Sequence, residues 1–251
     1  METLSAAKPR TRPTSTDLRL ANLLREARRP FLAKGFRCQL LPLKKRITSH
    51  PIFRQAAEGT LSVSRIHSLL QHFYPLIESF PLLMAANLAK ANRSTSLGHG
   101  KATSWLIDNI NVEQHHATWW RDWGYGFGCR PKDFDEHIPP PAVDALTHYL
   151  WSVNFRGSLA EGIAATNLAI EWPTGEWAAT VFTAMRKYKF RNPSKTLAWL
   201  SAHATYDEDH PFEAMQLIVL CTSTINDQRQ AISAATRAME YYLLALDTAM
   251  I

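Results

Sequence analysis

Apolar residues recur at helical spacing along almost the whole chain, and this pattern restricts the fold to an all-α class. The clearest stripe starts after Ser62, a predicted N-cap, and comprises Ile66, Leu69, Leu70, Phe73, Ile77, Phe80 and Met84. No window alternates apolar and polar residues with a period of two between hairpin turns, so the sequence gives no evidence for strands. A hydrophobic content of 46% over 251 residues is sufficient for the core of a helical bundle.

The same periodicity predicts further helices at residues 17–32, 101–123, 142–154, 158–186, 193–208, 211–224 and 227–249. We expect Pro75 and Pro81 to bend the long helix after Ser62 without ending it, because the apolar period continues past both. Glycines and prolines in residues 124–141 argue against regular structure there. We find no internal repeat and no linker that would divide the body of the protein.

The positive charge of the chain is concentrated at its N-terminal end. Residues 1–46 hold 12 Lys and Arg against 3 acidic residues, a net charge of +9, whereas the remaining chain has a net charge of −3. We therefore predict a disordered basic tail over residues 1–16 and one helical domain over residues 17–251, with a peripheral basic arm at 17–46. We interpret the arm as an amphipathic helix on the body, and contact with a nucleic acid or another acidic surface is the alternative.

Cysteine content and hydropathy indicate the cellular setting. The three cysteines, Cys38, Cys129 and Cys221, are widely spaced, which excludes a disulfide framework and a Cys-x-x-Cys site and suits a reducing compartment. No apolar run approaches the roughly 18 to 20 residues of a membrane span, and no secretory signal is evident. We expect a cytoplasmic protein without a membrane span.

A run of metal-binding residue types occurs in the segment HATYDEDH. His203, Asp207 and His210 lie at positions i, i+4 and i+7, which places their side chains on one stripe of a helix. Imidazole and carboxylate groups that converge from one face can bind a transition metal. A surface charge cluster is the alternative interpretation of this segment.

A second candidate motif is Glu113 and His116, at i and i+3 of an otherwise apolar helix. Glu-x-x-His motifs that face carboxylates from other helices hold the metals of di-iron and di-manganese bundles. His115 points about 100° away from His116 and remains an alternative ligand. Asp108 is a weaker alternative, seven residues before His115.

The third candidate ligand is Glu171, which lies within the apolar run of residues 163–177. A buried carboxylate without a cation is energetically costly, so a metal is a natural partner. Pro173 lacks the N–H that would bond back to Ala169, and we expect a kink there, as also before Pro211. The three acids supply a charge of −3 and two Fe(II) ions would bring +4, so the net charge of +1 would be neutralised by an anionic substrate. Six protein ligands also leave coordination positions of two octahedral ions open for the substrate and for O2.

These three segments resemble the haem-oxygenase-like di-iron oxidases, and within them most closely the undecene-forming fatty-acid decarboxylases. The resemblance rests on WLIDNINVEQHHATWW, AATNLAIEWPTGEW and WLSAHATYDEDHPFEA and extends from about residue 48 onward. It implies a seven-helix bundle related to the thiaminase and haem-oxygenase folds, one or two Fe(II) ions, and O2 as co-substrate. By the same resemblance the metal ligands are Glu113, His116, Glu171, His203, Asp207 and His210.

The implied reaction is the oxidative decarboxylation of a medium-chain fatty acid, a small-molecule carboxylate, to a terminal alkene. The predicted substrate pocket is formed by Phe73, Ile77, Phe80, Met84 and Trp172, although the first four also fit a plain core. The chain departs from the family pattern at Trp172, where a small residue is usual, and Trp172 could shorten or reroute an acyl tunnel. An external electron donor and a homodimer are left open.

Two alternative functions remain at this stage. The first is a di-iron oxygenase of the same fold that acts on an amino acid or another small carboxylate, which a polar cavity beside the metal would indicate. The second is a metal-free thiaminase-like hydrolase or a regulatory protein, which would need a thiol nucleophile or a basic face. Cys129 falls in an irregular loop and Cys221 in an apolar helical run, so neither is a strong candidate nucleophile.

Overall fold

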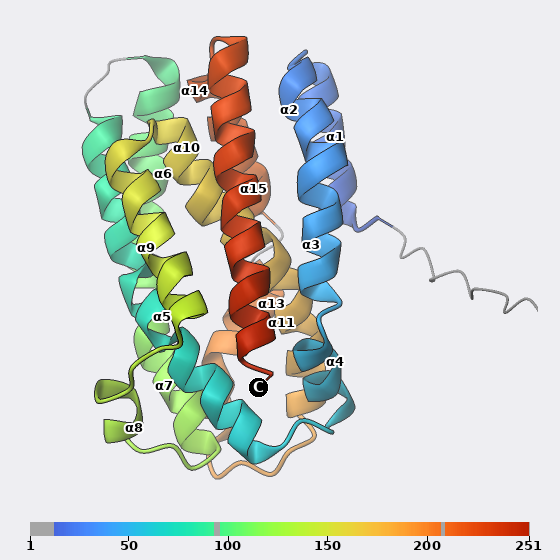
Figure 1. Cartoon of the computed structure of the whole chain (residues 1–251), viewed down its shortest axis with the longest axis vertical. Coiled ribbons are helices and arrows are strands. Elements are labelled where there is room, and N and C mark those ends of the chain that lie inside the picture. Colours follow the sequence, from blue (N-terminus) through green and yellow to red (C-terminus); the bar gives the residue numbers. More distant parts are fainter. Residues whose placement is uncertain (1–12, 93–95, 207–208, 251) are drawn as a thin grey trace, which may run out of the picture.

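The computed structural model describes residues 13–92, 96–206 and 209–250, excluding the side chains of residues 205–206. Within these ranges the chain forms helices and no strand, which confirms the predicted all-α class (Figure 1). Residues 1–12 of the predicted basic tail lie outside the described part.

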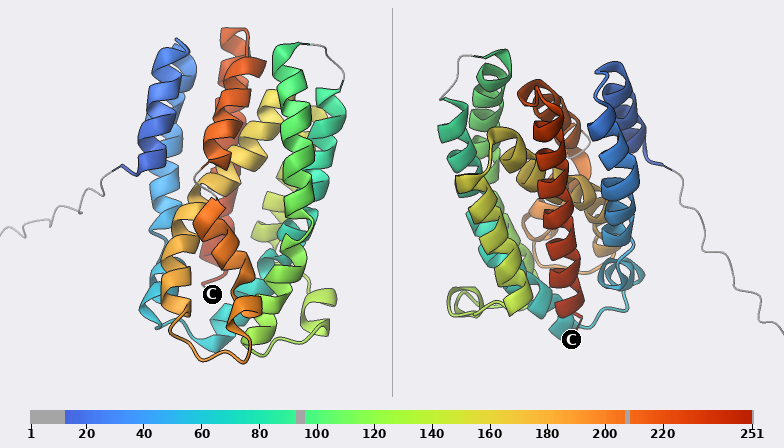
Figure 2. Two further views of the ribbon diagram at one scale, coloured as in Figure 1. Left: turned by 180° about the vertical axis from the view of Figure 1, so that it is seen from behind. Right: turned by 45° about the horizontal axis from the view of Figure 1, so that its top comes forward.

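Helices of 5 to 29 residues form the bundle around one hydrophobic core (Figure 2). They are α5 (Val63–Ala91), α6 (Leu97–Glu113), α7 (His116–Gly126), α9 (Pro141–Arg156), α10 (Leu159–Ile163), η2 (Ala164–Glu171), α11 (Trp172–Met185), α13 (Ala198–Tyr206), α14 (His210–Cys221) and α15 (Ile225–Thr248), with the short α8 (Lys132–Asp135) and α12 (Pro193–Thr196) in connections. The elements η1 (Phe36–Leu40) and η2 are π-helical, and the others are α-helical.

The helix α5 follows the sequence prediction closely. Ser62 caps its N-terminus by accepting a hydrogen bond from the Arg65 backbone N–H. Pro75 and Pro81 both lie inside the helix, which continues to Ala91. The buried stripe predicted from the spacing therefore faces the core along the whole element.

Four other predicted helices are interrupted. The helix expected at 17–32 is divided into α1 (Ser15–Glu26) and α2 (Pro30–Gly35), and the one expected at 193–208 into α12 and α13. The helix expected at 101–123 is divided into α6 and α7 by the turn at Gln114 and His115, whose backbone stays in the right-handed helical region. The helix expected at 158–186 is a succession of α10, η2 and α11. Pro173 is in the first turn of α11, where its missing N–H is tolerated, and the irregularity lies in the π-helical stretch that precedes it.

The N-terminal arm runs along one side of the bundle. It consists of α1 (Ser15–Glu26), α2 (Pro30–Gly35), η1 (Phe36–Leu40) and α3 (Leu41–Thr48), followed by α4 (Pro51–Glu58). Thr14 and Asp17 form a capping box, so the first helix begins two residues earlier than predicted. Figure 1 shows the arm beside α15, and its helices also contact α11 and α14.

A buried ion cluster fixes the arm to the bundle. The Lys44 ammonium, 2% exposed, lies 3.0 Å from Asp17 Oδ1 and also pairs with Glu176 of α11. Arg19 of α1 forms an exposed ion pair of 2.8 Å with Asp209, next to the predicted ligand His210. The arm is thus a packed element whose charges are partly neutralised by the body. None of the helices in the described ranges has the length and apolarity that crossing a membrane requires.

Candidate metal centre

Five of the six predicted ligands come from helix ends or helices that meet in the interior of the bundle. Glu113 ends α6, His116 begins α7, Glu171 ends η2, His203 lies on α13 and His210 begins α14. The sixth predicted ligand, Asp207, lies outside the described residues.

Glu113 and His116 form a buried pair across the turn between α6 and α7. Each is 5% exposed, and His116 Nδ1 lies 2.6 Å from Glu113 Oε2. The other ring nitrogen of His116, Nε2, is buried and has no hydrogen-bond partner among the described residues. A buried nitrogen without a partner is costly unless a ligand completes it, and a metal ion is one such ligand.

The Glu171 carboxylate is buried and held from two sides. Asn167, one turn earlier in η2, donates a hydrogen bond of 2.8 Å to Oε1, and His210 Nδ1 lies 3.3 Å from Oε2. Burial raises the pKa of Glu171, and the nearby charge of Glu113 adds to this effect, while His210 opposes it. The carboxylate is therefore in a place where a cation would be strongly stabilising.

His203 is oriented by the backbone and by an aromatic ring. Its Nδ1 lies 2.8 Å from the carbonyl oxygen of Trp199, so Nδ1 carries the hydrogen and Nε2 keeps its lone pair. The ring stacks on Trp199 at 3.7 Å and lies 4.7 Å from the His116 ring, between centroids. Burial, with a smaller contribution from His116, lowers the pKa of His203 well below its usual value. A neutral imidazole with one fixed tautomer is suited to bind a metal.

These residues fit a transition-metal centre of nitrogen and oxygen donors. In the ranges that the structure describes, no three His, Cys, Asp or Glu side chains are already assembled as a metal-binding group. Glu113 is directed to His116, and Glu171 to His210.

The two alternative ligands are placed elsewhere. His115 is exposed and stacks on Trp119, with 5.9 Å between the ring centroids. Asp108 is also exposed, on the outer face of α6. The buried orientation of Glu113 and His116 therefore favours them over His115 and Asp108.

A narrow cavity of about 40 Å³ adjoins the cluster. Its lining combines Glu113, His116, Glu171 and His203 with mostly apolar side chains: Phe53, Leu69, Phe73, Leu76, Ile77, Phe80, Trp120, Ile170, Thr174, Trp177, Trp199, Tyr242 and Leu246. The volume exceeds the roughly 10–15 Å³ that one water molecule requires. The buried donors thus open directly onto a largely apolar chamber.

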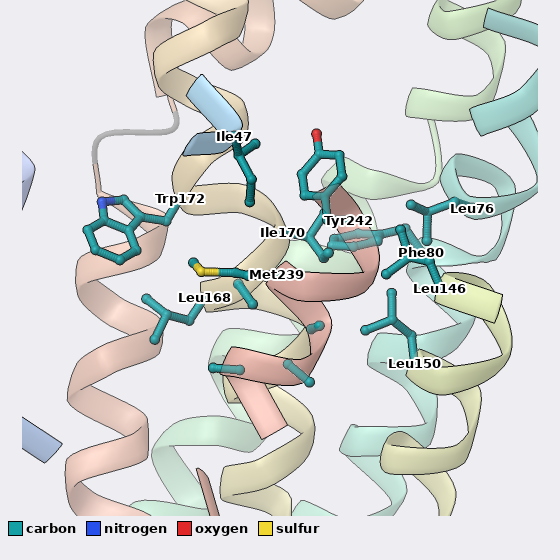
Figure 3. Packing of buried hydrophobic residues seen from close by; sticks show 14 of the residues in the cluster. Ile47, Leu76, Phe80, Leu146, Leu150, Leu168, Ile170, Trp172, Met239 and Tyr242 are labelled. Atoms are coloured by element: carbon teal, nitrogen blue, oxygen red, sulfur yellow. The ribbon is translucent and has the colours of Figure 1, made fainter. Parts of the chain in front are cut away.

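Only part of the predicted substrate pocket lines this cavity. Phe73, Ile77 and Phe80 do, whereas Met84 is fully buried in the core and Trp172 is directed away. Trp172 stacks on Phe36 of the arm at 5.1 Å between centroids. Among the buried hydrophobic residues of Figure 3, Trp172 lies at the left, away from Tyr242 and Phe80. Since Trp172 follows the last residue of η2, its side chain leaves the helix about 100° from Glu171.

Several residues of the site were not identified from the sequence. Asn167 and Trp199 each precede a ligand by four residues, and that spacing could have indicated their roles. Thr174 and Tyr242, which carry hydroxyl groups, also line the cavity. Tyr242 comes from α15, far away in the chain, and no local pattern connects it with the ligands.

The fold and the buried cluster of imidazole and carboxylate groups define the class as an all-α bundle with a candidate metal centre in its interior. A family model described as iron-containing redox enzyme matches residues 67–243. The chain belongs to this family of iron-containing redox enzymes.

Solved structures support the fold. A TenA homologue from Pseudomonas syringae pv. tomato str. DC3000 is 28% identical, with a TM-score of 0.80 and 99% of each chain covered. A domain with a haem oxygenase-like fold from Shewanella denitrificans OS217 is 14% identical, with a TM-score of 0.68 and coverage of 84% of this chain and 88% of that one. A TenA homologue from P. horikoshii OT3 is 13% identical, with a TM-score of 0.65 and coverage of 92% and 97%. No curated protein sequence matches the chain.

Proposed function

We propose that the protein is a non-haem iron-dependent oxidase that converts a medium-chain fatty acid to a terminal alkene by oxidative decarboxylation. The observation that carries this proposal is that metal-binding side chains and apolar side chains line the same cavity. Buried Glu113, His116, Glu171 and His203 lie at one part of it, and apolar side chains form most of the rest. Such a cavity suits a ligand with a carboxylate and an unbranched apolar chain.

The protein groups have distinct roles in this proposal. Glu113, His116, Glu171, His203 and His210 would hold the iron, together with Asp207. Bound iron would supply a Lewis acid for the substrate carboxylate and activation of O2. The apolar wall orients the chain and excludes water from the reacting carbons. Asn167 and the Trp199 carbonyl keep Glu171 and His203 in position.

The electron balance of the reaction indicates a further requirement. Loss of CO2 and of one hydrogen from the β-carbon gives the alkene, CO2, one proton and two electrons per carboxylate. Reduction of O2 to two water molecules takes four electrons, so an external donor would supply the other two. This supports the expectation of an electron-donor partner.

The alternative functions receive less support from the site. Apart from the predicted metal ligands, no charged side chain among the described residues lines the cavity, so nothing there would pair with the ammonium group of an amino acid. Similarity to TenA homologues suggests a thiaminase-like activity, which would need a thiol nucleophile. None of the three cysteines, all of which are among the described residues, lines the cavity. Burial raises the pKa of the Cys129 thiol and raises that of Cys221 to about 11, which disfavours both as nucleophiles.

The test combines metal analysis with product detection. Purified protein is incubated with Fe(II), O2, a chemical reductant and saturated fatty acids of several lengths, and the headspace is analysed for alkenes one carbon shorter. We expect a product with at least one chain length, and failure with all lengths would reject the fatty-acid substrate. Equal iron binding by wild type, His203→Ala and Glu171→Ala would reject the metal centre itself.

A further inference from the structure

Tyr242 carries a polar group among the mostly apolar residues that line the cavity. Tyr242 lies on α15, is 4% exposed and lines the cavity together with Thr174 and Trp177. Burial raises the pKa of Tyr242 to about 12, so the hydroxyl keeps its hydrogen at neutral pH. A buried hydroxyl hydrogen normally has a short acceptor, and this requirement can be checked group by group.

The hydrogen bonds around Tyr242 leave its own hydrogen without a short acceptor. Trp177 Nε1 donates to the Tyr242 oxygen at 3.1 Å, which uses a lone pair and not the hydrogen. The Thr174 hydroxyl donates to the Ile170 carbonyl oxygen at 2.7 Å. Across the 3.5 Å between the Thr174 and Tyr242 oxygens, the available hydrogen is therefore that of Tyr242.

That remaining contact is long. Hydrogen bonds between two oxygen atoms are usually about 2.5–3.0 Å, so 3.5 Å lies at the outer limit. Among the described residues, no nearer acceptor faces the Tyr242 hydroxyl. An oxygen atom of a bound ligand would provide a better acceptor at this position.

The position of this donor relative to the metal ligands defines which part of a substrate it meets. Thr174 follows Glu171 by three residues, so the two side chains are neighbours on one helical face. A substrate whose carboxylate lies at the predicted metal ligands would pass Thr174 and Tyr242 with the first few carbons of its chain. Phe73, whose ring centroid lies 6.0 Å from that of Tyr242, provides apolar contact at the same level.

We infer that Tyr242 is a specificity residue that donates a hydrogen bond to an oxygen atom carried on the substrate chain near its carboxyl end. The substrate class is then an oxygenated fatty acid, with a hydroxyl, oxo or ether oxygen, in preference to a plain saturated acid. This inference rests on the proposed function only in placing the substrate carboxylate at the metal ligands. The net contribution of a hydrogen bond between two uncharged groups corresponds to about a three- to tenfold preference in affinity.

The experiment measures a ratio of affinities. Iron-loaded protein is titrated without O2 against dodecanoic acid and against dodecanoic acids that carry an oxo or hydroxyl group at carbon 3, 4, 5 or 6. Quenching of tryptophan fluorescence reports binding, since Trp177 and Trp199 line the cavity. We expect one oxygenated acid to bind about three to ten times more tightly than dodecanoic acid to the wild type, and the ratio to fall to near one in Tyr242→Phe.

Tyr149→Phe is the matched control. The Tyr149 hydroxyl donates to the Ala234 carbonyl oxygen at 3.1 Å, and Tyr149 does not line the cavity, so the preference should persist in this variant. The inference is overturned if the wild type prefers none of the oxygenated acids, a result that needs no variant to fold. It is also overturned if Tyr242→Phe keeps the preference. A hydroxyl that bound only the carboxylate or water would contribute equally to both kinds of acid, and its removal would leave the ratio of affinities unchanged.

The two levels of proposal fail in different ways. If the wild type binds neither iron nor any of the acids, the proposed function is rejected. If it binds iron and dodecanoic acid but shows no preference for an oxygenated chain, the proposed function stands and the role of Tyr242 is rejected.

Discussion

Replacing Glu171 with Gln should uncouple the stability of the protein from iron. The carboxylate is 4% exposed, receives a hydrogen bond from Asn167 and lies 3.3 Å from His210 Nδ1. The amide is nearly isosteric but has no charge to desolvate, and it is a poor metal ligand. The variant without metal should therefore be at least as stable as the wild type, whereas its affinity for iron should fall strongly.

The expected size follows from binding linkage. A ligand present at 100 times its Kd stabilises the folded state by about 2.7 kcal/mol. For a chain of this length, each kcal/mol shifts the Tm by about 2–4 °C, so iron should raise the wild-type Tm by about 5–11 °C. If the substitution weakens binding about 100-fold, the same iron concentration contributes only about 0.4 kcal/mol, a shift of about 1–2 °C.

The assay is thermal unfolding under anaerobic conditions with and without Fe(II). Glu240→Gln provides the control, because Glu240 is half-exposed and pairs with Arg237 at 3.7 Å on the surface. It should keep the full iron-dependent shift. The reasoning is refuted if Glu171→Gln retains that shift or if Glu240→Gln loses it.

Three further predictions concern the support of the site, the packing of the arm and a half-buried histidine of α5. Asn167→Leu, which removes the donor to Glu171, should lower iron affinity about 10- to 100-fold in an equilibrium titration while the helical content is retained. Lys44→Met should reduce the free energy of unfolding in urea by about 3–5 kcal/mol, because Asp17 is left buried without its cation. Burial lowers the pKa of His72 to about 4, so the unfolded chain takes up the proton first as the pH falls from about 6.5. Stability should therefore decrease between about pH 6.5 and 4, and His72→Asn should reduce this decrease in thermal unfolding measured across that range.

Each of these predictions has a contradicting result. Unchanged iron affinity in Asn167→Leu would show that the hydrogen bond does not orient the ligand. Adding Asp17→Leu to Lys44→Met should recover much of the lost stability, and no recovery would contradict the burial argument. An identical pH dependence in wild type and His72→Asn would show that other groups determine the loss at low pH.

The periodic pattern was sufficient to predict the fold class and most helices because one face of each helix is buried. It failed where both faces are buried. From Leu159 to Pro173 almost every residue is inside, so no period distinguishes an α-helix from the π-helical stretch η2. The break between α6 and α7 was also not predictable, since Gln114 and His115 have no special turn chemistry.

Some residues of the candidate site could likewise be predicted from the sequence, and others could not. Spacing within one segment was sufficient to select Glu113 and His116, and the apolar surroundings in the sequence were sufficient to select Glu171. The structure brings all three to one interior cavity. The direction of Trp172 could not be predicted, because it depends on the register in which η2 ends and on the arm residue Phe36. Tyr242 could not be predicted either, because it lies on α15 and no local pattern in the sequence shows that this helix faces the cavity.

The π-helical geometry of η2 makes the position of Glu171 depend on the number of residues before it. Hydrogen bonds in a π-helix span five residues in place of four, so this stretch contains more residues than an α-helix following the same path. Deleting or inserting a residue here would rotate Glu171 by about 100° relative to the elements before it wherever the change is not absorbed by a switch between π-helical and α-helical geometry. We therefore expect proteins of this fold to gain or lose the site by a change of chain length in this stretch as readily as by substitution of a ligand.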